Sequence, residues 1–136
     1  MNAQFALAVF LITWGIFKSR RWLLETEVNA FLSTLEADPA YSESTQLAYA
    51  NDLRVFLLYL ETVEESKPAL EDLDTEHVIS FLEAERNLGR RRNTLVRRLA
   101  TLTYFQDYLV EGGSLTGNQF DGNHSRIKQV ISVSYT

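Results

Sequence analysis

Residues 89–113, GRRRNTLVRRLATLTYFQDYLVEGG, constrain the fold more than any other stretch of the chain. Apolar side chains recur there at steps of three and four, which predicts an amphipathic helix with one face in a core. These side chains are Leu95, Leu99, Leu102, Phe105 and Leu109. Gly112 and Gly113 then supply the usual helix stop.

The first half of this predicted helix is strongly basic, with five arginines and no acidic residue: Arg90, Arg91, Arg92, Arg97 and Arg98. The formal net charge of the protein is −5, but residues 25–85 hold 15 acidic and 2 basic residues, whereas residues 86–110 hold six arginines and one aspartate. A helix that is buried on one side and cationic near its N-terminal half suits a polyanion, and double-stranded DNA is one interpretation of that partner. The competing interpretation is a solvated helix face whose arginines pair with acidic neighbours.

Three further helices are predicted before residue 89. One covers residues 22–35 and ends before Pro39, because a residue that precedes proline disfavours the helical region. The next begins at Ser42, a good N-cap, and keeps apolar residues from Leu47 to Leu60 toward the core. Asp74 caps another, with Val78 and its apolar neighbours turned inward. The predicted fold class is therefore all-α, a compact bundle of four helices over residues 25–117.

No metal or cofactor is expected. The chain has no cysteine, and its two histidines, His77 and His124, are too few and too far apart in sequence to suggest a zinc site. No G-x-S-x-G motif or paired-ligand motif organises the serine, histidine and aspartate residues, so independent catalysis is not expected.

The N-terminal segment, residues 1–24, contains fifteen uncharged residues at positions 3–17, followed by Lys18, Arg20 and Arg21. A helix of that length spans ~22 Å, short of the ~30 Å hydrocarbon core of a bilayer. Three interpretations stay open: an apolar helix packed on the domain or on a partner, a segment in contact with a membrane, and a non-native extension. At the other end, residues 118–136 are rich in loop formers, and the β-branched run from Ile127 to Tyr135 predicts a single strand or a frayed tail within an irregular C-terminal tail.

Three blocks carry a resemblance to a known family. They are residues 41–56 (YSESTQLAYANDLRVF), residues 70–82 (LEDLDTEHVISFL) and residues 93–109 (NTLVRRLATLTYFQDYL). In this order and spacing, with S-x-x-T-x-x-x-Y leading to the arginine helix, they resemble the N-terminal core-binding, SAM-like domain of tyrosine recombinases, the phage integrase family. The resemblance implies two crossed helix pairs that form one half of a clamp around DNA, with the second and fourth helices on the duplex. It also implies a cytoplasmic protein that takes part in DNA integration and recombination, with other recombinase protomers as further partners.

By this resemblance six side chains would touch the DNA, mostly at phosphates: Ser42, Thr45, Tyr49, Asn93, Thr94 and Arg98. The chain departs from the family pattern at three places. The family often has a basic residue near Asn51 and at the position of Thr103, and it usually has Asn-Pro where this chain has Asn118-Gln119. The family's nucleophilic tyrosine and its arginine and histidine partners lie on a C-terminal catalytic domain that we expect this chain to lack, so no enzyme activity is expected. The alternative function is a membrane-tethered or protein-interaction helical domain that does not bind nucleic acid.

Overall fold

A computed structural model describes residues 23–132 of the chain, and within them the structure contains helices and no strand. The all-α class is therefore confirmed. In chain order the elements are α2 (Leu24–Ala37), α3 (Glu43–Glu64), the 3-10 turn η1 (Leu70–Asp72), α4 (Thr75–Asn87), α5 (Arg92–Glu111) and α6 (His124–Ser132).

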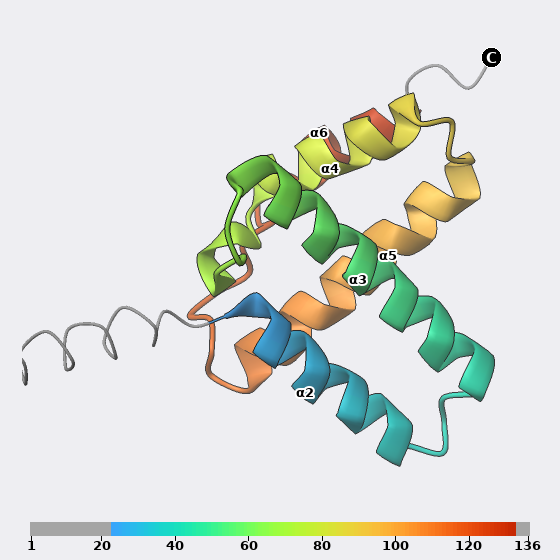
Figure 1. The fold of residues 1–136 in the computed structure, drawn as a ribbon, viewed down its shortest axis with the longest axis vertical. Helices are drawn as coiled ribbons and strands as arrows, with labels where there is room; N and C mark the ends of the chain where they lie inside the picture. The colour runs from blue at the N-terminus through green and yellow to red at the C-terminus, as the bar shows by residue number, and fades with distance from the viewer. Residues whose placement is uncertain (1–22, 133–136) are drawn as a thin grey trace, which may run out of the picture.

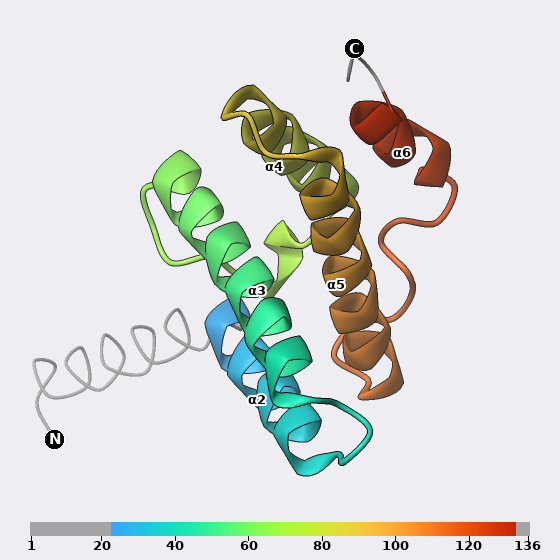
Figure 2. The ribbon, with the colours of Figure 1, turned by 90° about the vertical axis from the view of Figure 1, so that its right-hand side faces the viewer.

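Helices α2 and α3 lie side by side and antiparallel, while α5 crosses α3 (Figures 1 and 2). The turn between α2 and α3 is held by Asp38, whose Oδ1 accepts a hydrogen bond of 2.9 Å from the amide of Ala40. Ser42 then caps α3 by accepting a hydrogen bond from the amide of Thr45, as predicted. The cap satisfies one of the amides that a helix start leaves unpaired.

The segment between α3 and α4 ties the start of α2 to the rest of the bundle. The amide of Leu24 donates to the carbonyl of Pro68, 3.1 Å away, and Leu23 forms an isolated bridge with Ala69. Helix α4 begins where predicted, because Asp74 accepts a hydrogen bond of 2.8 Å from the amide of His77. These links fix where α4, and through it α5, emerges from the bundle.

The predicted basic helix is α5, which begins at Arg92 and ends at Glu111, with Gly112 as its C-cap. Gly113 follows with a φ of 81°, a left-handed conformation that glycine adopts without steric cost. The predicted apolar face of this helix packs inward: Leu95, Leu102, Phe105 and Leu109 are fully buried, and Leu99 is partly buried.

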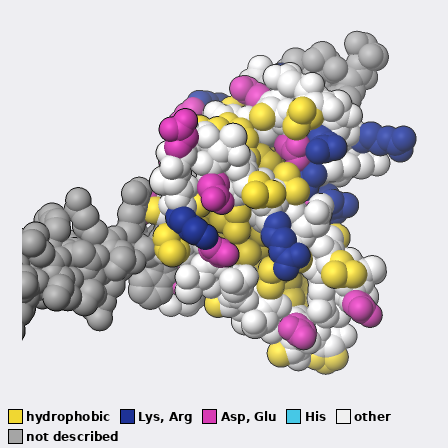
Figure 3. All heavy atoms as spheres, viewed as in Figure 1, with side chains coloured by type: hydrophobic (Ala, Val, Ile, Leu, Met, Phe, Trp, Pro, Cys, Tyr) yellow, Lys and Arg dark blue, Asp and Glu magenta, His cyan; other side chains and the backbone are white. Residues whose placement is uncertain are grey.

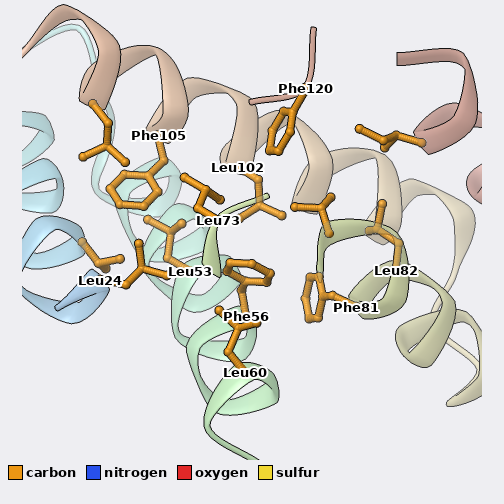
Figure 4. Close-up of a cluster of buried hydrophobic side chains, with 14 of the residues drawn as sticks. Leu24, Leu53, Phe56, Leu60, Leu73, Phe81, Leu82, Leu102, Phe105 and Phe120 are labelled. Carbon is orange, nitrogen blue, oxygen red and sulfur yellow. The ribbon is translucent and has the colours of Figure 1, made fainter. Parts of the chain in front are cut away.

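One hydrophobic core of mainly leucine and phenylalanine side chains joins the helices (Figure 4). Phe56 of α3 meets Phe81 of α4 edge to face with ring centroids 5.1 Å apart, and Phe31 of α2 meets Phe105 of α5 at 5.4 Å. Truncating one such ring to alanine costs about 3–5 kcal/mol, so these contacts hold the position of α5 firmly. Leu47 is an exception to the predicted inward face of α3, because its side chain is 64% exposed.

The strand or frayed tail predicted near the C-terminus is wrong for the residues that the structure describes. Residues His124–Ser132 form α6, which packs on α4 and α5 (Figure 1). Ile127, Val130 and Ile131 are buried. Their spacing of three and one is that of a helix face, and burial against α4 outweighs the strand preference of β-branched side chains. The bundle therefore has a fifth helix beyond the four that were expected.

The predicted apolar N-terminal segment lies almost entirely in residues 1–22, outside the described part of the chain, as do residues 133–136. Within residues 23–132, no helix combines the length and the hydropathy needed to cross a bilayer.

Candidate nucleic-acid interface

The predicted site residues lie on the first turns of α3 and on the first half of α5. Figure 3 shows lysine and arginine side chains gathered at the right-hand edge of the molecule, over the N-terminal end of α5. Acidic side chains lie mostly elsewhere on that face. The uneven charge along the sequence is thus also uneven in space.

Helix α3 contributes two hydroxyl groups at its N-terminus. The Oγ of Ser42 lies 2.9 Å from Oγ1 of Thr45 and also accepts the amide of Thr45, so both side chains are held at the helix start. Ser42 is exposed and Thr45 is partly exposed. Capping and contact with a phosphate are compatible, because a hydroxyl both donates and accepts.

One turn further along α3, Tyr49 is the centre of a row of three aromatic rings. Its ring centroid lies 6.3 Å from that of Tyr41 and 6.0 Å from that of Tyr104 on α5. The pKa of Tyr49 is raised, first by burial, then by Tyr104 and Tyr41, and last by Asp52. Its phenol therefore stays protonated at neutral pH and is a hydrogen-bond donor. The contact of Tyr49 with Tyr104 joins α3 to α5 at this surface.

The start of α5 presents three successive arginines. Arg90, Arg91 and Arg92 are exposed, as is Asn93, while Thr94 is partly exposed. Arg91 occupies the N-cap position, and within residues 23–132 no side chain caps the helix. The first turn also contains no acidic residue. Uncapped amides and the positive end of the helix dipole add to the guanidinium charge, which makes this end an anion-binding feature.

Arg97 and Arg98 both bind one buried carboxylate, that of Asp52 on α3. Arg97 donates from Nε (3.1 Å to Oδ2) and from Nη2 (2.8 Å to Oδ1). Arg98 donates from Nη1 to Oδ1 at 3.0 Å, and the hydroxyl of Thr101 donates to Oδ2 at 2.8 Å. Asp52 is 0% exposed, whereas the side chain of Arg97 is 45% exposed. Its hydrogen bonds with Asp52 raise the pKa of Arg97, against the opposing effect of burial.

The network continues to α4. Nε of Arg98 lies 2.7 Å from Oε1 of Glu85, in an ion contact whose geometry is not that of an aligned hydrogen bond. Oε2 of Glu85 accepts a hydrogen bond of 3.2 Å from Nε of Arg90. Positive and negative side chains thus alternate from the half-exposed Arg97, through the buried interior, to the half-exposed Arg90. In order, the members of this chain of charges are Arg97, Asp52, Arg98, Glu85 and Arg90.

The burial of Arg98 argues against its predicted contact with a phosphate. Its side chain is 5% exposed and lies between two carboxylates, so it is not placed to reach a phosphate. Arg98 instead binds α3 and α4 to α5. The interpretation in which arginines pair with acidic neighbours therefore describes Arg98 well, whereas Arg91 and Arg92 form no ion pair within residues 23–132.

Sequence reasoning missed Asp52 and Glu85 as members of the site. Each is an acid at a helix position that faces the core, and Asp52 stands beside the buried Leu53. An acid on an apolar face needs a buried partner, which was the available signal. The partner itself could not be identified, because Arg98 lies 46 positions away in the chain.

One group of potential metal ligands occurs where α3, η1 and α4 meet. Ligand atoms of Glu64, Asp72 and His77 lie within 4.8 Å of one another. Each already has a role in the fold: Asp72 accepts the amide of Ala69 at 2.7 Å, and His77 lies 3.2 Å from Glu64 and 2.9 Å from Asp74. These contacts at the ends of α3 and α4 account for why the three side chains lie close together.

Comparison with known proteins identifies the family of this domain. Residues 28–113, more than half of the chain, match the family described as phage integrase, N-terminal SAM-like domain. The chain belongs to this family. The resemblance seen in the sequence is thereby confirmed, and the SAM-like domain connects the chain to recombinases and integrases. The matched residues include all of α3, α4 and α5 and exclude α6.

A tyrosine recombinase, XerC of Methylobacterium nodulans (strain LMG 21967 / CNCM I-2342 / ORS 2060), is 35% identical to the chain over 86 residues. That match covers 62% of this chain and 27% of the recombinase. The chain therefore spans about a quarter of the length of this relative. No solved structure gave a significant match.

Proposed function

We propose that this chain binds double-stranded DNA as the core-binding module of a tyrosine recombinase or integrase, in DNA integration and site-specific recombination. The observation that carries the proposal is the exposed arginine cluster at the uncapped start of α5, the helix that crosses α3 (Figure 1). A DNA partner also favours a cytoplasmic location and contact with other recombinase protomers.

The physical basis of binding is the neutralisation of phosphates. Each guanidinium that approaches a phosphate releases condensed counterions, so affinity falls as salt rises. Arg91 and Arg92 supply exposed charge, and the amides at the start of α5 supply further donors. On α3, Ser42, Thr45 and Tyr49 offer further hydroxyl donors. Such contacts fix the register of a protein on the duplex without reading bases.

The proposed module holds DNA and does not cut it. Of the residues at this surface, Tyr49 has the chemistry closest to a nucleophile, but its raised pKa disfavours the phenolate. Arg97 and Arg98, which could otherwise assist a nucleophile, are both bound to the carboxylate of Asp52. Cleavage of DNA would therefore need residues beyond this interface.

The test is the salt dependence of binding to a duplex of about two helical turns, measured by fluorescence anisotropy. For the wild-type chain we expect the logarithm of the binding constant to fall linearly with the logarithm of salt concentration. The variant Arg91→Gln/Arg92→Gln should bind more weakly, with a slope shallower by roughly 2, because two phosphate contacts are lost.

The matched control removes the same charge elsewhere. Arg54 and Lys67 are exposed and line a groove near the start of α2 together with Glu25. Arg54→Gln/Lys67→Gln should leave the slope within about 0.5 of the wild type. Equal losses in the two double variants would show that net charge, and not the start of α5, governs binding.

The groove between α5 and α6 favours a second candidate, a protein-interaction domain that does not bind nucleic acid. Val96, Leu99 and Ile131 line this groove, with Arg92 and Lys128 also among its residues. Under this alternative, Val96→Asp should abolish capture of a protein partner, and the wild-type chain should show no measurable DNA affinity at low salt.

A further inference from the structure

We propose that Asp52 is a positioning residue for DNA binding: it holds the guanidinium of Arg97 in one orientation so that the unused donors of Arg97 meet a phosphate. The inference rests on the proposed function and adds to it a residue that never touches the DNA. The juxtaposition that carries it is a fully buried carboxylate bound to one edge of a half-exposed arginine.

The geometry of Arg97 leaves one edge of the guanidinium available. Nε and Nη2 bind the carboxylate of Asp52 at distances of 2.8–3.3 Å. Within residues 23–132, no hydrogen bond from Nη1 is seen. Because the guanidinium is planar and rigid, binding one edge fixes where the remaining N–H groups point. The side chain of Arg97 as a whole is 45% exposed, so it is open to solvent on one side.

The anchor for Arg97 is itself rigid. Asp52 lies on α3 and receives hydrogen bonds from Arg98 at 3.0 Å and from Thr101 at 2.8 Å, so its carboxylate does not follow the movements of Arg97. An arginine that stands alone loses rotamer freedom when it binds a phosphate, and that loss opposes binding. Arg97 has already lost this freedom in the folded protein. The pre-formed pair therefore binds a phosphate at a smaller entropic cost than a solvated arginine does.

The carboxylates do not cancel the attraction for phosphate. The chain of charges contains three arginines and two carboxylates, so its net charge is +1. The half-exposed members of this set are the guanidinium groups of Arg90 and Arg97, while Asp52 and Glu85 are buried. A phosphate at the surface thus meets positive ends first.

Arg97 also lies between the two halves of the proposed interface. Asp52 is close enough to Tyr49 to contribute to its raised pKa, and Tyr49 contacts Tyr104, which stands seven positions after Arg97 on α5. Seven residues are close to two helical turns, so Arg97 and Tyr104 share a face of the helix. A phosphate at Arg97 would sit between the first turns of α3 and the start of α5.

The test separates orientation from charge. Arg97→Lys keeps the charge but cannot form the two-point contact with Asp52, whereas Arg97→Ala removes both. Arg54 serves as the matched control, because it is exposed, is not part of the proposed interface and forms no ion pair within the described residues. Each variant is titrated with the same duplex of about two helical turns at low salt, by fluorescence anisotropy.

We expect Arg97→Ala to weaken binding roughly tenfold, and Arg97→Lys to weaken it to within about twofold of Arg97→Ala. Arg54→Lys should stay within about twofold of the wild type, because a solvated arginine acts mainly as a charge. Wild-type affinity in Arg97→Lys, beside a clear loss in Arg97→Ala, overturns the inference and leaves the proposed function standing. Wild-type affinity in Arg97→Ala also overturns the inference and leaves the proposed function standing. Absence of binding by the wild-type chain overturns both.

A second comparison tests whether Asp52 acts through Arg97. Asp52→Asn is made in the wild type and in Arg97→Ala, and both are measured where circular dichroism shows that they are folded. We expect Asp52→Asn to weaken binding in the wild type and to change it by less than about twofold in Arg97→Ala. Equal losses in the two backgrounds overturn the inference. If Asp52→Asn does not fold, the comparison of Arg97→Lys with Arg97→Ala decides alone.

Discussion

Replacing Arg98 by alanine should damage stability far more than any direct contact with DNA. Its side chain is 5% exposed and lies between two carboxylates that are at most 4% exposed. Breaking a buried ion pair by removing one partner costs about 3–5 kcal/mol. Arg97 and Thr101 still bind Asp52, and Arg90 still binds Glu85, so we expect a loss near the lower end, about 3 kcal/mol.

A loss of about 3 kcal/mol is a large part of the roughly 5–15 kcal/mol that stabilises a typical domain. With a urea m-value of about 1.5 kcal/mol/M, it lowers the midpoint of unfolding by about 2 M. The assay is urea unfolding followed by circular dichroism at a helix wavelength. The matched control is Arg92→Ala, for which we expect a change within about 0.5 kcal/mol, because Arg92 is exposed.

Arg98→Ala and Arg92→Ala should have the opposite order of effects on DNA binding, where Arg92→Ala is the more damaging change. Under conditions where Arg98→Ala is folded, its salt slope should match that of the wild type, whereas Arg92→Ala should lose about one unit of slope. The reasoning is refuted if Arg98→Ala costs less than about 1 kcal/mol, or if it retains its stability and loses a unit of slope. The first result would show that Arg98 is not held in a buried ion pair, and the second that it also contacts phosphate.

Four further outcomes follow from single residues. Ile127→Ala should cost about 2–5 kcal/mol in urea unfolding if α6 is part of the cooperative fold, and a negligible loss would show that α6 is detached. Ser42→Ala should cost about 1 kcal/mol through the lost cap of α3, with Ser44→Ala as a near-neutral control. Gly113→Ala should cost about 1 kcal/mol because φ is 81° there, although no atom crowds an added methyl group. The raised pKa of Tyr49 contributes stability that is present below the ordinary tyrosine pKa of 10.0 and is lost as pH rises through the raised pKa. Tyr49→Phe should therefore lose less stability in urea unfolding at alkaline pH than the wild type does. The same dependence of stability on pH in both proteins would contradict the shift.

The helices that could be predicted are those with local signals. The apolar period in residues 89–113 lies within one segment, and the caps at Ser42 and Asp74 act over three residues. Such patterns follow from helix geometry and need no tertiary information. For this reason α3, α4 and α5 were expected close to where they are found.

The parts that were missed depend on contacts between distant segments. The nine residues of α6 are few for an independent helix, and their β-branched side chains favour a strand until α4 buries them. The carbonyl of Val130 also accepts a hydrogen bond of 2.9 Å from Arg86 on α4, 44 positions earlier in the chain. Neither contact leaves a local pattern in the sequence.

The interface shows the same division. The exposed arginines at residues 90–92 could be predicted as surface charge, because nothing in their neighbourhood opposes it. Arg97 and Arg98 have almost the same local sequence, yet one is half-exposed and the other is buried. Only the crossing of α3 and α5, which brings Asp52 beside them, distinguishes the two.

The most direct test of the central claim is the map of amide chemical-shift changes when a short duplex is added to the isotopically labelled chain. We predict the largest changes at residues 42–52 on α3 and at residues 90–104 on α5, reduced by added salt. Amides along the exposed face of α2 should change little. Changes confined to α2, or no changes at low salt, would contradict a DNA-binding surface formed by α3 and the arginine-rich start of α5.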